Sequence, residues 1–261
     1  MSSLRSRPYR GVFPFRSSHP MLVAIMTYAL LAQAGPDEEV ISQGPGYRVQ
    51  FDVKSYSGKA SFVVTAHHDW APFACARFMQ LVKRGFYNDT RIFLINDRYL
   101  QFGLKGGSHA QELLERVKKE DASTGEPLEH LPGRIAFVPT KTEQKWERDE
   151  KQKGDPLYIE DGAGSTQLMI HFMDNTEKLK DEGVRPFGEI EGTGMATIRK
   201  FYKPTKDDSI DIETLMREDE GFNKYLDEQV PKLTKIVSAK VLETWKSRQL
   251  LVKKKKAKDE V

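Results

Sequence analysis

Two short stretches that pass from glycine and polar residues into apolar runs constrain the fold of this chain most. The first reads GFYNDTRIFLI at residues 85–95, and the second reads GSTQLMI at residues 164–170. A glycine-led turn followed by branched and aromatic residues is typical of a buried β-strand. Similar short runs recur along the chain, whereas helical spacing is rare, so the sequence predicts a mainly β fold.

The expected strands and helices can be placed from residue patterning. Apolar and polar residues alternate at 49–53 and 60–64, with a hairpin turn at 57–59 between them. Core spacing predicts a helix within 70–82, with Asp69 as its cap, Pro72 in its first turn and Phe73 and Cys75 on its buried face. Further strands are expected at 91–95, 99–102, 135–138, 167–172 and 236–242, and a second helix is expected at 195–201.

In this order, the segments resemble the cyclophilins, a family of peptidyl-prolyl cis-trans isomerases. The two opening stretches are similar to the strand motifs that frame the family's active site. Further matches are QFG at 101–103, PFGEI at 186–190, GM at 194–195, and NKYL with PKL within 223–233. The resemblance covers residues 47–241. It implies a domain at about 44–243 that is a closed antiparallel eight-stranded barrel capped by two helices.

The resemblance also implies a groove whose main catalytic residue is an arginine, and Leu94 stands at that position. Gln101 matches a family glutamine if one residue is deleted before it; without that gap, Phe102 occupies the position. Gln167 matches a second glutamine, so Gln101 and Gln167 are the expected catalytic contacts. The expected substrate-binding residues are Tyr99, Phe102, Val138, Met169 and Leu179.

Prolyl isomerisation explains why the arginine matters. Rotation about a peptide bond crosses a barrier of ~18–20 kcal/mol, and a catalyst must stabilise the twisted amide. This requires an apolar slot for the proline ring and preorganised hydrogen-bond donors, but no nucleophile, metal or cofactor. Leu94 cannot donate a hydrogen bond. Arg91 has an odd offset from it on the strand, and Arg98 would share its face only along an unbroken strand, which Asn96 and Asp97 disfavour.

We therefore expect a peptidyl-prolyl isomerase that assists protein folding with weakened activity. The alternative is a non-catalytic module that binds proline-containing polypeptides, or another protein, through the groove or a charged insertion at about 140–160. We expect a monomer without cofactor or metal. Net charge is +3, and removing the four arginines of residues 1–34 leaves −1, which argues against nucleic-acid binding.

The ends of the chain predict targeting rather than folded structure. Residues 1–34 hold arginines, an apolar run at 21–31 and the small-x-small sequence Ala32-Gln33-Ala34, which favour a signal peptide. An uncleaved anchor that holds the protein to a membrane through residues 21–34 stays open, as does a mitochondrial or plastid transit peptide. We expect the secretory pathway, either the lumen of the endoplasmic reticulum or secretion.

Two weaker signals agree with that destination. Asn88-Asp89-Thr90 fits the glycosylation sequon, and the chain ends in KDEV, one residue from the KDEL retrieval signal. Residues 35–43 are expected to be a linker, and residues 244–261 a basic solvated tail. The single cysteine, Cys75, excludes an intrachain disulfide and is expected to be a buried thiol.

Overall fold

The computed structural model describes residues 38–105, 117, 129–139, 164–204 and 226–253. The predicted targeting segment at 1–34 and the charged insertion at 140–160 lie outside these residues. The chain divides into a unit at Gly44–Ser247 and a second unit formed by Met1–Gln43 and Arg248–Val261. In the second unit, β1 (Glu38–Gln43) pairs antiparallel with β10 (Arg248–Lys253). Strand structure therefore replaces the linker expected at 35–43 and part of the tail expected at 244–261, because backbone pairing between the two segments supplies the partners that neither has alone.

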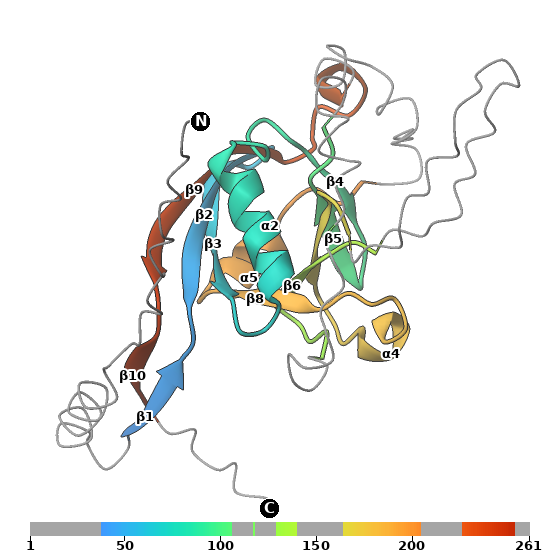
Figure 1. The fold of residues 1–261 in the computed structure, drawn as a ribbon. Coiled ribbons are helices and arrows are strands. Elements are labelled where there is room, and N and C mark those ends of the chain that lie inside the picture. The colour runs from blue at the N-terminus through green and yellow to red at the C-terminus, as the bar shows by residue number, and fades with distance from the viewer. Residues whose placement is uncertain (1–37, 106–116, 118–128, 140–163, 205–225, 254–261) are drawn as a thin grey trace, which may run out of the picture. The chain divides into compact units, whose positions relative to one another are not determined.

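The described part of the larger unit is built on one eight-stranded antiparallel sheet (Figure 1). Its order is β4-β5-β7-β6-β8-β3-β2-β9. The strands are β2 (Gly46–Ser55), β3 (Gly58–His67), β4 (Ile92–Ile95), β5 (Tyr99–Phe102), β6 (Arg134–Phe137), β7 (Leu168–His171), β8 (Pro186–Ile190) and β9 (Lys235–Trp245). This confirms the predicted mainly β fold of eight antiparallel strands with few helices.

The sheet curls so that the chain next to its first strand meets its last strand. An isolated antiparallel bridge joins Arg91, just before β4, to Lys235 on β9. The amide N–H of Ile92 donates to the Thr234 carbonyl at 2.9 Å, and the Ile236 N–H donates to the Thr90 carbonyl at 2.9 Å. Joining the two edges in this way leaves fewer backbone groups unpaired than an open sheet would.

Helix α2 (Pro72–Lys83) covers one side of the barrel, as Figure 1 shows. Pro72 opens the helix as predicted, but Ala71, not Asp69, holds the N-cap position, and it makes no side-chain capping bond. Phe73 is 40% exposed, so its predicted place in the core is wrong. The buried face of the helix begins at Ala74 instead. Cys75 is fully buried as predicted, and its thiol lies 3.6 Å from the Phe187 carbonyl oxygen.

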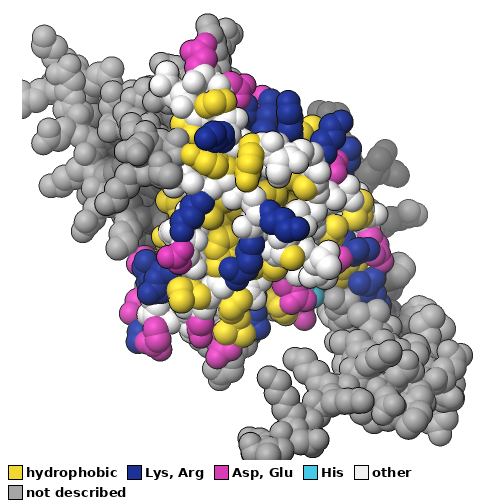
Figure 2. Space-filling view, turned by 180° about the vertical axis from the view of Figure 1, so that it is seen from behind, with side chains coloured by type: hydrophobic (Ala, Val, Ile, Leu, Met, Phe, Trp, Pro, Cys, Tyr) yellow, Lys and Arg dark blue, Asp and Glu magenta, His cyan; other side chains and the backbone are white. Residues whose placement is uncertain are grey.

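Two shorter helices, α4 (Thr176–Leu179) and α5 (Gly194–Ile198), follow β7 and β8. The predicted second helix at 195–201 thus exists but ends earlier. Among the described residues, no helix is both long and apolar enough to cross a bilayer. Over the middle of the face drawn in Figure 2, hydrophobic and basic side chains are interspersed, and acidic side chains lie mainly toward its margins.

The barrel interior joins the two stretches that opened the sequence. Aromatic rings of Phe51, Phe78, Tyr87 and Phe102 pack with centroid separations of 5.6–6.2 Å. The Tyr87 hydroxyl, from the first stretch, donates to the carbonyl of Thr166, from the second, at 3.1 Å. The buried hydroxyl group is thereby satisfied, and the two stretches are held side by side.

Candidate active site

A row of side chains crosses four neighbouring strands on the sheet face opposite Phe102, and its members on β6 and β7, Ala136 and Met169, are buried. Register pairs Leu94 on β4 with Gln101 on β5, Gln101 with Met169 on β7, and Met169 with Ala136 on β6. Directly paired residues in an antiparallel sheet share a face, so these four side chains form one row. Leu94 and Gln101 are half-buried, and Met169 is 2% exposed. The structure thus brings together three residues predicted from sequence, with Leu94 at the arginine position.

The adjacent row points the other way, into the barrel. Phe102 pairs with Leu168, Leu168 pairs with Phe137, and all three side chains are at most 1% exposed. Phe102 therefore fills the core beside Phe51 and Tyr87 and does not join the groove as predicted. Leu179 lies on α4 and packs in the main core cluster, as Met169 does, but no strand pairing places it in the row that contains Gln101.

Gln167 and Val138 lie beside each other, where β7 begins and β6 ends. Tyr99 lies near the other end of β7, where it pairs with His171. The Val138 N–H donates to the Gln167 carbonyl at 2.9 Å, and both side chains are half-buried. Gln167 precedes Met169 by two residues, which is the spacing of side chains on one face of a strand. This arrangement places an amide and an aliphatic side chain next to the row.

A bulge in β4 determines what surrounds Leu94. Ile92 pairs with Phe102, but Leu94 pairs with Gln101, so Phe93 is one residue too many on its strand. Phe93 belongs to a second hydrophobic cluster, outside the main core. The cluster consists of Phe93, Leu104, Leu226, Val230 and Leu233. Leu94 packs against this second cluster, so the residue at the arginine position contributes packing and offers no donor.

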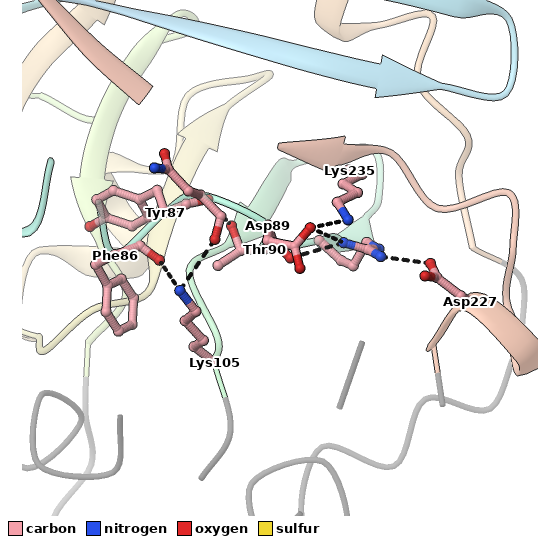
Figure 3. Close-up of polar contacts among 9 residues, drawn as sticks. Phe86, Tyr87, Asp89, Thr90, Lys105, Asp227 and Lys235 are labelled. Atoms are coloured by element: carbon pink, nitrogen blue, oxygen red, sulfur yellow. Dashed lines mark hydrogen bonds and ion pairs between the residues drawn. The ribbon is translucent and has the colours of Figure 1, made fainter. Parts of the chain in front are cut away.

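Arg91 binds other groups and cannot supply the missing hydrogen-bond donor. Its side chain is 2% exposed, and Nη2 lies 2.6 Å from the Asp227 carboxylate, while Nη1 donates to the Asp89 carbonyl at 2.9 Å. Figure 3 shows these contacts where the barrel closes, with Lys235 against the Asp89 carboxylate and Lys105 reaching the Phe86 carbonyl. The cluster ties the first stretch to the segment that follows residue 226.

The first and last residues of the sequon Asn88-Asp89-Thr90 make hydrogen bonds within the fold. Asn88 Oδ1 accepts from the Ala239 N–H at 2.9 Å, and the fully buried Thr90 donates its hydroxyl proton to the Tyr87 carbonyl at 2.7 Å. Asp89 between them has φ of 68°, the left-handed conformation that glycine adopts most easily. Asn88 and Thr90 thus both take part in hydrogen bonds that hold this turn.

Next to Tyr99 lies a network of two buried histidines, His130 and His171, that the sequence did not predict. Tyr99 pairs with His171, whose Nε2 lies 3.0 Å from His130 Nδ1. His130 Nε2 lies 3.3 Å from the Val184 carbonyl, and Asn175 Nδ2 lies 3.1 Å from His171 Nδ1. The only sequence signal was a histidine inside the apolar run at 167–172.

The Val184 carbonyl fixes both protons in this network. A carbonyl can only accept, so His130 Nε2 carries hydrogen and its Nδ1 accepts from His171 Nε2. His171 Nδ1 then accepts from the Asn175 amide, so both rings are neutral. Burial, with a smaller contribution from His130, lowers the pKa of His171 to about 3, and burial also lowers the pKa of His130.

The sequence model of the family described as "Cyclophilin type peptidyl-prolyl cis-trans isomerase/CLD" matches residues 49–219. No curated protein matches the chain. In the described part of the chain, no group of three or more His, Cys, Asp or Glu side chains is arranged to hold a metal ion.

Proposed function

The chain belongs to the cyclophilin-type peptidyl-prolyl cis-trans isomerase family, and on that premise we propose that it binds proline-containing polypeptides in the groove and isomerises them weakly. The proposed groove comprises Leu94, Tyr99, Gln101 and the buried Met169, with Gln167 and Val138 beside it. Assistance to protein folding would follow from this activity, because prolyl isomerisation takes tens of seconds uncatalysed.

The side chains of the groove support binding. Met169 is buried and would form the apolar floor beneath a pyrrolidine ring, and it is flanked by Gln101 in register and by Gln167 two residues before it. Both glutamines carry amide N–H donors and a carbonyl acceptor, which suit a peptide backbone. A slot of this composition can hold a proline residue without any charged group.

The observation that carries the proposal of weak activity is Leu94 in the row. A leucine provides no hydrogen bond to the twisting amide, and losing one preorganised donor in a comparable site costs roughly 10²–10³ in rate. Arg91, the nearest arginine in sequence, is held by Asp227 and Asp89. The remaining donors of the proposed groove are the amides of Gln101 and Gln167 and the Tyr99 hydroxyl, all of them uncharged.

The packing of Leu94 favours the second candidate, a binding module without catalysis. Leu94 contacts the second hydrophobic cluster, to which Leu226, Val230 and Leu233 contribute. The position that would hold the catalytic donor is therefore part of a packed surface. In this case the groove would hold a proline segment without accelerating its rotation.

The deciding experiment is exchange spectroscopy by NMR on a short Ala-Pro peptide with the full-length chain. Weak acceleration by the wild type, and a gain of at least tenfold in Leu94→Arg, would support a slot that lacks its donor. Leu94→Met is the matched control, since it keeps an apolar side chain of similar volume and should leave the rate unchanged.

Other outcomes separate the two candidates. A wild-type protein that binds the peptide without accelerating exchange is a binding module. A folded wild type that neither binds nor accelerates would refute the groove-based function altogether, and chemical-shift changes at Gln101 and Met169 would report binding independently of catalysis.

A further inference from the structure

Positive charge is left without carboxylate partners at the Tyr99 end of the groove. The exposed Arg98 donates from Nη1 to Asn175 Oδ1 at 3.4 Å, and the exposed Lys178 places its ammonium 5.8 Å from the centroid of the Tyr99 ring. An amide oxygen and an aromatic ring are neutral partners, so they orient the two cations without neutralising them. Among the described residues, neither cation has a carboxylate within ion-pair distance.

Three of the carboxylates nearby in sequence have other partners. Asp97 pairs with Lys203 at 2.7 Å, and Glu177 pairs with Lys180 at 2.8 Å. Asp174 Oδ1 accepts from the Thr176 N–H at 2.8 Å. Asp97 and Glu177 are therefore paired with other lysines and Asp174 is held by a backbone amide, so none of the three pairs with Arg98 or Lys178.

The backbone beneath the cations is held in place. The Arg98 carbonyl accepts from the Phe172 N–H at 2.8 Å and from Asn175 Nδ2 at 3.2 Å. Lys178 is carried by α4, for which Asn175 is the N-cap residue. Asn175 fixes the segment that bears Arg98 and begins the helix that bears Lys178, so both cations are held on backbone next to Tyr99, with Lys178 over its ring.

We propose that the Tyr99 end of the groove is a subsite for a carboxylate side chain, so that preferred ligands carry aspartate or glutamate next to the proline. This inference rests on the proposed function, because it assumes that proline segments occupy the groove. Two exposed charge contacts correspond to a preference of roughly 2- to 10-fold over a neutral ligand. Salt should reduce it, since exposed charges are screened.

The test is an NMR chemical-shift titration of the full-length chain with three peptides that differ only in the residue before proline: glutamate, glutamine or lysine. The expected order of affinity is glutamate, then glutamine, then lysine. The difference between the glutamate and glutamine peptides should shrink in about 1 M salt. Three equal affinities would overturn the inference while leaving the proposed function intact.

Variants test which side chains produce the preference. In the double variant Arg98→Gln and Lys178→Gln, the glutamate and glutamine peptides should bind equally. Lys59→Gln is the control, because it removes an exposed lysine charge from β3, away from Tyr99, and should keep the preference. A preference that survives the double variant would refute the assignment. If no peptide binds to the folded wild type, the proposed function fails and this inference fails with it.

Discussion

Acidification should destabilise this protein through the pair of buried histidines beside Tyr99. The pKa of His171 is about 3 when folded, against about 6.5 in an unfolded chain. The unfolded state therefore binds a proton that the folded state excludes, so stability is highest above pH 6.5 and falls continuously as pH drops from 6.5 toward 3. His130 acts in the same direction because burial lowers its pKa as well.

The loss of unfolding free energy can be calculated from the change in pH. Each pKa unit is worth about 1.4 kcal/mol, so lowering the pH from 6.5 to 5 removes about 2 kcal/mol through His171 alone. Asp174 opposes this shift, while His130 and Arg134 reinforce it. Above pH 5 the histidines dominate the change in stability, because the carboxylates with lowered pKa, such as Glu189 and Asp174, titrate at lower pH.

The assay is urea denaturation followed by tryptophan fluorescence at pH 7.5 and pH 5. The wild type should lose about 2 kcal/mol or more of unfolding free energy between these conditions. The double variant His130→Gln and His171→Gln removes both titrating rings and should lose much less, whatever its stability at pH 7.5. His68→Gln, which alters an exposed histidine outside the network, is the matched control. A double variant with the full wild-type dependence would refute the reasoning.

Two further predictions concern the first stretch. Asp89→Gly should be more stable than Asp89→Ala by about 1 kcal/mol in urea denaturation, because both lose the contact with Lys235 but only glycine accepts a φ of 68° without strain; equal stabilities would show that this backbone is unstrained. Asn88→Ala should lower the free energy of unfolding by about 1 kcal/mol in the same denaturation, because it leaves the Ala239 N–H without its acceptor; an unchanged free energy of unfolding would contradict this.

Most strands and the first helix could be predicted because their signals are local. Alternation at 49–53 and 60–64 matches β2 and β3, and Pro72 marks the first residue of α2. The pairing of β1 with β10 could not be predicted, because it joins segments at opposite ends of the chain and neither has a distinctive pattern. The histidine network was missed for the same reason: His130 and His171 are neighbours only in the folded barrel.

A shift of one residue in the strand register determines whether Gln101 or Phe102 shares a face with Leu94. Sequence matching left two candidates for the glutamine position, Gln101 with a gap and Phe102 without one. Side chains alternate along a strand, so only one of the two can face outward. The bulge at Phe93 resolves the choice, because the extra residue in β4 pairs Leu94 with Gln101 and turns Phe102 toward the core.

The same bulge connects the absent arginine to the second hydrophobic cluster. It places Phe93 among Leu226, Val230 and Leu233, with Leu94 packed against them. Fully burying a leucine contributes about 1.5–3 kcal/mol, and a half-buried one contributes part of this, whereas a guanidinium in that cluster would have to turn its charge back to solvent. Donor and packing thus compete for one position, and Leu94 stabilises the contact of β4 with residues 226–233 at the expense of the hydrogen bond on which catalysis in this family depends.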